Sequence, residues 1–154
     1  MANSQQVKKQ VEQFHREMVE LIKKYQFRDR NEMTCCGMSV SQCYVLETLH
    51  RCGPLTMNAL AEKMYLKIST MTRVVEQLVI KKYVTRVEDV KDRRFRHIQL
   101  TKEGEAAFDA SWKNVFASEK TILENFPEAQ RDMLIQLLKQ LNRAVEDWRS
   151  CCSR

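Results

Sequence analysis

Apolar residues recur along most of the chain at steps of three and four, which is the period of an amphipathic helix. Near the start this pattern spans residues 4–29, with Ser4 as the expected N-cap and Val7 and Phe14 among the residues of the apolar stripe. Residues 30–40 form a connector, and the same period returns after it. From residue 41 onward we expect five more helices: 41–51, a short helix capped by Thr56, 68–81, 102–124 and 127–149.

Two stretches near the middle have a different pattern. Residues 83–87 and 95–100 are short and rich in β-branched and aromatic residues, and a strongly charged loop separates them. We expect them to pair as a β-hairpin.

The helix at 68–81 has two unlike faces. One face is apolar and should be buried, with Met71, Val74, Val75, Leu78 and Val79. With the two short helices before it, this helix makes a helix-turn-helix pattern, and the hairpin that follows would be its wing. The polar face would point outward and suits hydrogen bonds to base edges and phosphates; it carries Ser69, Thr70, Thr72, Arg73, Glu76 and Gln77.

Composition supports a helical, globular chain. Of 154 residues, 44% are hydrophobic and 30% charged, and only three are Gly and two Pro, so few tight turns are expected. We predict a mainly α fold with a small β-hairpin. No apolar run approaches the roughly 18 residues needed to span a bilayer, and the N-terminus is polar, so we expect a cytoplasmic protein without a membrane partner.

Charge is concentrated in one stretch. Residues 67–102 hold ten basic and four acidic residues, an excess of six that equals the formal net charge of +6 for the whole chain. A neutral body with one basic stripe is typical of a nucleic-acid-binding protein. Arginines at the tip of a hairpin can enter the minor groove, where the potential is most negative.

Several short motifs in a fixed order carry a resemblance to a known family. They are Leu60-Ala61-Glu62, Ser69-Thr70-Met71-Thr72-Arg73-Val74-Val75, Leu78, Asp89, Asp92-Arg93-Arg94 and Leu100-Thr101-Lys102-Glu103-Gly104.

These motifs resemble the winged helix-turn-helix of the MarR family of transcriptional regulators. The resemblance implies one MarR-type domain over residues 1–154, with the winged helix-turn-helix at 41–101 and dimerisation helices at 1–30 and 102–150. It also implies a homodimer that binds double-stranded DNA at a pseudo-palindromic site. Carried over by position, Ser69, Thr70, Thr72 and Arg73 would face DNA on the recognition helix, Arg93 and Arg94 would sit in the wing, and Asp92 would hold an arginine there by an ion pair. The expected DNA-binding residues also include Gln77 on the polar face and Lys91 and Arg96 in the basic stretch.

The sequence departs from the family pattern at two positions. A glycine usually follows the recognition helix, where a left-handed backbone is wanted, but Lys81, Lys82 and Tyr83 stand there. Either Lys82 adopts a strained conformation or the turn differs. The Ser that usually caps the recognition helix is replaced by Lys67.

The cysteines include two adjacent pairs. Cys35 and Cys36 lie in the first connector, and Cys151 and Cys152 lie in the tail; we expect both pairs to be non-helical and exposed. In an intertwined dimer the four thiols could meet as a soft-metal or iron–sulfur site or as a redox switch, or they could be unselected surface residues. The other two are expected to pack as small apolar residues: Cys43 and Cys52.

The expected function is a DNA-binding transcriptional regulator, a repressor released by a small-molecule effector, a soft metal or a thiol-reactive oxidant. The alternative is a helical module that binds only protein. An enzyme is not expected, because the sequence has no Gly-rich phosphate loop, His-Glu-x-x-His or Gly-x-Ser-x-Gly motif.

Overall fold

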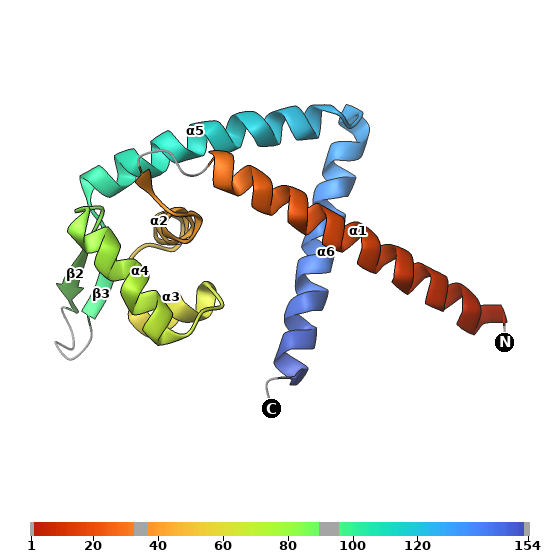
Figure 1. Ribbon diagram of the computed structural model, residues 1–154, viewed down its shortest axis with the longest axis horizontal. Helices are drawn as coiled ribbons and strands as arrows, with labels where there is room; N and C mark the ends of the chain where they lie inside the picture. Colours follow the sequence, from red (N-terminus) through yellow and green to blue (C-terminus); the bar gives the residue numbers. More distant parts are fainter. Residues whose placement is uncertain (1, 33–36, 90–95, 153–154) are drawn as a thin grey trace. The chain divides into compact units, whose positions relative to one another are not determined.

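The computed structural model describes residues 2–32, 37–89 and 96–152 (Figure 1). The chain forms two compact units, residues 1–115 and residues 116–154. Helices dominate, beside one small antiparallel sheet, so the expected fold class is confirmed. The elements in order are α1 (Ala2–Glu32), α2 (Val40–Cys52), β1 (Leu55–Thr56), α3 (Met57–Lys63), α4 (Ile68–Ile80), β2 (Val84–Glu88), β3 (Arg96–Leu100), α5 (Lys102–Glu124) and α6 (Glu128–Cys152).

The sheet has three strands where the sequence predicted two. Strand β3 lies in the middle and pairs antiparallel with β2 and with the two-residue β1, in the order β1-β3-β2. In this register Arg96 of β3 lies opposite Glu88 of β2. On the other edge of β3, Ile98 lies opposite Leu55 of β1. The predicted hairpin is therefore present, and β1 ties it to the segment between α2 and α3.

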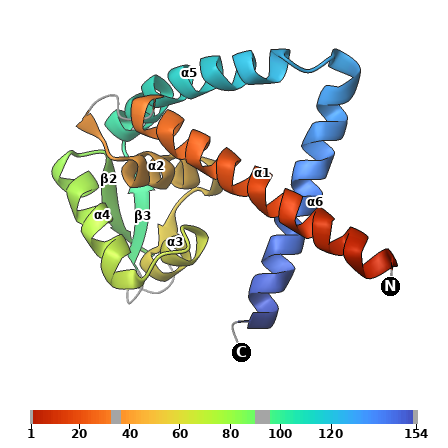
Figure 2. The same cartoon turned by 45° about the vertical axis from the view of Figure 1, so that its right-hand side comes forward.

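An apolar cluster joins α2, α3, α4, the sheet and α5 as far as Val115. Figures 1 and 2 show α2, α3 and α4 gathered beside β2 and β3. On α4 three of the five expected core residues are buried and Val74 is partly buried, but Val79 is 39% exposed, so its expected burial is wrong. The largest fully buried side chains are Leu46, Leu60, Met71, Leu78, Ile98, Val45 and Val75.

The helix starts differ in how they are capped. Ser39 caps α2 in a capping box with Gln42, and Thr56 caps α3 by accepting the Ala59 N–H at 3.3 Å. Lys67 precedes α4 without any side-chain cap, as the sequence indicated. Ser4 is not a cap, because α1 already begins at Ala2.

Both helices of the helix-turn-helix end in the same left-handed turn without a glycine. After α4, the Lys82 N–H bonds the Val79 carbonyl and the Tyr83 N–H bonds the Leu78 carbonyl, with φ of 61° at Lys82. After α3, Tyr65 is the left-handed residue, with φ of 54°; its N–H bonds the Glu62 carbonyl, and the Leu66 N–H bonds the Ala61 carbonyl. These are Schellman motifs, so of the two alternatives left by the sequence it is the strained conformation of Lys82 that occurs.

This strain gives a first testable prediction. A left-handed backbone costs a residue with a Cβ about 1–2 kcal/mol, and glycine avoids most of that cost. We therefore expect Lys82→Gly to raise the free energy of unfolding by up to about 1 kcal/mol, because greater freedom in the unfolded chain offsets part of the gain. Urea unfolding followed by circular dichroism measures the change. Lys82→Ala is the control that removes the side chain but keeps the strain; equal stability of the two variants would contradict the prediction.

Candidate nucleic-acid interface

The exposed face of α4 carries the polar residues that the helical period placed there. Ser69, Thr70, Arg73 and Gln77 are exposed, whereas Thr72 is partly buried and its hydroxyl donates to the Ile68 carbonyl at 2.9 Å. Met71, Val75 and Leu78 anchor the opposite face in the core. The helix is thus held firmly on one side, and a row of hydrogen-bonding side chains is exposed to solvent on the other.

The first turn of α4 adds backbone donors to this face. Because no side chain caps the helix at Lys67, the first N–H groups of α4 have no side-chain acceptor there. Such groups and the helix dipole favour an anion. The start of α4 is suited to a phosphate in this way, and Lys67 itself is exposed beside it.

The hairpin supplies further positive charge. Arg96 on β3 is exposed and lies 3.8 Å from the Glu88 carboxylate on β2, an ion pair that is largely open to solvent. Arg86 on β2 is also exposed, and the sequence had not singled it out. The other expected residues of the hairpin lie outside the described part of the chain: Lys91, Asp92, Arg93 and Arg94.

One lysine of the basic stretch has a structural contact. The Lys81 ammonium donates to the Gly37 carbonyl and lies 3.4 Å from the Gln42 amide oxygen, so it ties the end of α4 to the start of α2. Simple charge counting along the sequence could not separate such a lysine from those that face solvent.

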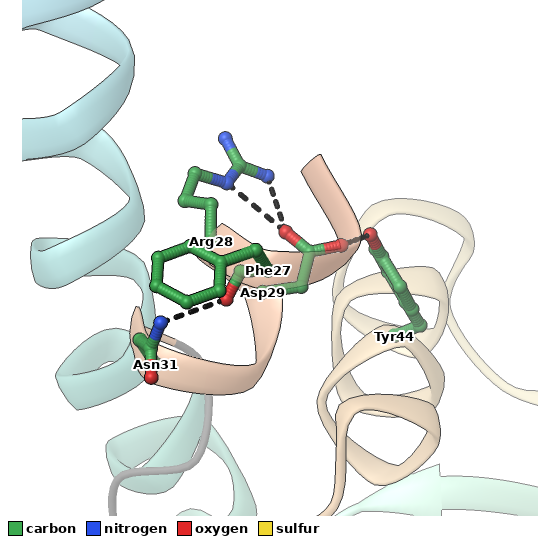
Figure 3. Close-up of polar contacts among 5 residues, drawn as sticks. All are labelled: Phe27, Arg28, Asp29, Asn31 and Tyr44. Atoms are coloured by element: carbon green, nitrogen blue, oxygen red, sulfur yellow. Dashed lines mark hydrogen bonds and ion pairs between the residues drawn. The ribbon is translucent and has the colours of Figure 1, made fainter. Parts of the chain in front are cut away.

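The end of α1 is joined to α2 by a polar cluster (Figure 3). Asp29 is only 6% exposed; its carboxylate accepts two hydrogen bonds from Arg28, at 3.0 Å from Nε and 2.6 Å from Nη2, and a third from the Tyr44 hydroxyl of α2. The Arg28 guanidinium also lies 4.4 Å from the centre of the Tyr25 ring. A buried carboxylate satisfied in this way fixes the angle between α1 and α2.

This cluster should make stability depend on alkaline pH. Burial, and then the hydrogen bond to the Asp29 carboxylate, raise the pKa of Tyr44 above its ordinary value. The folded protein therefore keeps the proton at a pH where the unfolded chain loses it, which is above about 10. The contribution of the Tyr44 proton to the free energy of unfolding is fully present below about pH 10 and is lost as the pH rises above that value. We expect the free energy of unfolding to fall more steeply between about pH 10 and 11.5 in the wild type than in Tyr44→Phe.

The measurement is urea unfolding at several pH values, with Tyr65→Phe as a control at an exposed tyrosine. Parallel pH profiles for the wild type and Tyr44→Phe would contradict the prediction.

A second cluster joins α2 to the start of α5. His50 Nδ1 lies 2.8 Å from a Glu105 carboxylate oxygen, and the His50 ring stacks on Phe108 at 4.3 Å between ring centres. Phe108 in turn stacks on Trp112, which is 44% exposed. The start of α5 is thereby fixed against the body that carries α4.

The cysteines follow the expectations only in part. Cys43 is buried as expected, but Cys52 is exposed, because it ends α2 where the helix leaves the core. Cys151 is exposed as expected, yet it and Cys152 belong to α6 and are not in a non-helical tail. Cys35 and Cys36 lie outside the described residues. Within residues 2–32, 37–89 and 96–152, no group of three or more His, Cys, Asp and Glu side chains could hold a metal ion.

None of the helices in the described segments is both long and apolar enough to cross a bilayer.

Comparisons with known proteins agree with this architecture. A sequence model of the MarR family matches residues 38–95, from just before α2 to just before β3. The chain is 31% identical over 106 residues to the HTH-type transcriptional repressor MdtR of Bacillus subtilis, covering 69% of this chain and 66% of that protein. It is 26% identical over 137 residues to the uncharacterized HTH-type transcriptional regulator YxaD of the same species, covering 89% and 96%.

Solved structures share the fold at lower identity. A MarR family protein from Bacillus stearothermophilus superposes with a TM-score of 0.82 at 23% identity, covering 90% of this chain and 97% of that one. Streptococcus pneumoniae FabT, solved in complex with DNA, superposes with a TM-score of 0.77 at 17% identity, covering 89% and 98%.

Proposed function

The chain belongs to the MarR family of transcriptional regulators, and we propose that it is a repressor that binds a pseudo-palindromic operator as a homodimer and is released by an effector. Family membership establishes a transcriptional regulator with a DNA-binding winged helix, and not an enzyme. The operator, the dimer, the sign of regulation and the effector are the content of the proposal.

The observation that carries the proposal is the exposed face of α4. Its hydroxyl, guanidinium and amide groups, on Ser69, Thr70, Arg73 and Gln77, can bond base edges in the major groove, while its uncapped first turn can bind a phosphate. We assign the hairpin, with Arg96 and residues 91–94, to the adjacent minor groove. The positive charge of the hairpin would then supply affinity for DNA, and α4 would supply most of the sequence specificity.

Exposed apolar faces support the homodimer. On α1 the large side chains left open to solvent include Val7, Val11 and Phe14, which are 50–60% exposed. On α6 they include Leu137 and Trp148, at 57% and 67%. Apolar surface of this extent usually marks an interface, and a two-fold dimer would set two α4 helices against two half-sites. We therefore assign residues 1–30 and 102–150 to dimerisation and 41–101 to DNA binding.

The sign of regulation and the effector complete the proposal. MdtR, at 31% identity, is a repressor by name, and this favours repression here. For release we propose a small molecule or a change at the cysteines, either oxidation or binding of a soft metal or an iron–sulfur group. The exposed Cys151 is accessible to such a signal, and Cys35, Cys36 and Cys152 are its candidate partners.

The test measures binding of a labelled duplex from the protein's own promoter by fluorescence anisotropy, beside a scrambled duplex of equal composition. We expect tighter binding to the promoter, and an affinity that falls steeply as salt rises from about 50 to 200 mM. Arg73→Ala should cost about 1–3 kcal/mol on the promoter duplex and less on the scrambled one, because a base contact is lost.

The matched control is Arg16→Ala, which removes the same charge from an exposed position on α1. Equal affinity for both duplexes, or an equal loss in both arginine variants, would contradict the proposal.

A further inference from the structure

One residue on the exposed face of α4 does not fit a surface that only attracts phosphates. Glu76 is exposed and lies one helical turn after Arg73, on the side away from the buried Met71, Val75 and Leu78. It is the one acidic residue of this helix. A negative charge here would approach DNA together with the rest of the face.

Within the described part of the chain, Glu76 and Arg73 take part in no ion pair, although their spacing of three residues often gives one. The Glu76 carboxylate also accepts no hydrogen bond there. The two opposite charges are therefore both available to a ligand, and the structure gives Glu76 no visible role in folding.

A free carboxylate can only accept hydrogen bonds, and this restricts what it can contact. In the major groove the base donors are the N4 amino group of cytosine and the N6 amino group of adenine. Adenine also presents the acceptor N7 beside its donor, which would repel the second carboxylate oxygen. Cytosine has no such acceptor on that edge, so a carboxylate favours cytosine.

The position of Glu76 fits a neighbouring base pair. At a rise of about 1.5 Å per residue, Glu76 lies about 4.5 Å along the helix from Arg73. Successive base pairs lie about 3.4 Å apart along one strand. Two side chains on one face of α4 can thus contact adjacent base pairs.

We propose that Glu76 is a specificity-determining residue that accepts a hydrogen bond from the N4 amino group of one cytosine in each operator half-site, next to the base pair contacted by Arg73. This inference rests on the proposed function, since it needs α4 in a major groove. The carboxylate weakens binding to all other sequences, because it stays unpaired near the phosphates.

The experiment selects duplexes from a randomised pool with the full-length protein and sequences them. The variants are Glu76→Gln and Glu76→Ala, and the control is Glu62→Gln, which removes an exposed negative charge from α3 instead. We expect the wild type to prefer cytosine at one half-site position by about tenfold or more. Glu76→Gln should change that preference to adenine, because an amide can bond both N6 and N7. Glu76→Ala should abolish the preference, and Glu62→Gln should keep the wild-type sequence.

Other outcomes overturn the inference in distinguishable ways. If both Glu76 variants select the wild-type sequence and bind every duplex more tightly, the carboxylate only repels phosphates. If preferences change at several positions, Glu76 acts through the orientation of α4 and not by a base contact. If the wild type itself selects no common sequence, the proposed sequence-specific function fails and this inference fails with it.

Discussion

Gly104→Ala is expected to lower the free energy of unfolding by about 3 kcal/mol or more, although alanine is the better helix former. Gly104 is buried in the first turn of α5, and a Cβ there would lie 1.9 Å from the carbonyl oxygen of Tyr83. That carbonyl accepts the Thr101 N–H at 3.1 Å, so it cannot turn away without breaking a hydrogen bond. The backbone itself must move, because the clash is not with a flexible side chain.

The same contact joins α5 to the turn after α4. Thr101 caps α5 by accepting the Gly104 N–H at 3.0 Å, and its hydroxyl also donates to the Lys82 carbonyl at 2.6 Å. Strand β2 begins at Val84, directly after this turn. Forcing α5 away should therefore displace the hairpin from α4, and DNA affinity should fall together with stability.

Thermal and urea unfolding measure the effect, with Glu103→Ala as the control at an exposed position of the same turn. We expect the control to stay within about 0.5 kcal/mol of the wild type. A Gly104→Ala variant as stable as the control would mean that the close approach of α5 to Tyr83 does not exist in solution.

The sequence predicted the order of the large elements well because the helical period is a local signal. The helix at 102–124 and the start of α4 at residue 68 agree with the structure. The ends of α1 and α6 were placed too early, because the last residues of these helices are polar or small and add nothing to an apolar stripe. Such ends are fixed by the backbone, which periodicity does not report.

Features that depend on contacts between distant residues could not be predicted. Strand β1 has two residues and exists only because it pairs with β3, more than 40 residues later. Likewise the hydrogen bond from Tyr44 to Asp29 joins two helices through residues that lie 15 positions apart in the sequence, and no spacing pattern predicts it. The motif containing Gly104 was visible, but its reason, the carbonyl of Tyr83, is visible only in the fold.

The sequence predicted which face of α4 points outward, but not the contacts of each side chain on it. Helical geometry correctly turned Ser69, Thr70 and Arg73 outward, whereas Thr72 turned out to be partly buried and bonded to its own helix. The helical period also placed Glu76 on this outward face, but a count of positive charge gives an acidic residue no role there. The proposed role of Glu76 depends on its exposure beside Arg73 and on the absence of an ion pair between them within the described residues, which the sequence alone does not show.

The second large effect concerns the exposed apolar face of α6. We expect the double variant Leu137→Asp/Val145→Asp to convert a dimer into monomers of 18.2 kDa and to weaken operator binding by about 10²- to 10⁴-fold. Both side chains are more than half exposed on the single chain, so the substitutions should cost little within one protomer. In a two-fold interface, however, each new charge occurs twice and would be buried without a partner.

The loss of affinity would follow from the loss of joint binding. When two half-site contacts are linked, the second forms at a high effective concentration, and monomers forfeit that advantage. Analytical ultracentrifugation gives the mass, and fluorescence anisotropy gives the affinity for a full operator and for a single half-site. The control Gln136→Asp/Gln140→Asp adds the same charge at exposed polar positions of α6 and should stay dimeric. If the double variant remains a dimer, the face of α6 does not form the interface; if it is monomeric yet binds the full operator as tightly as the wild type, binding does not require two subunits.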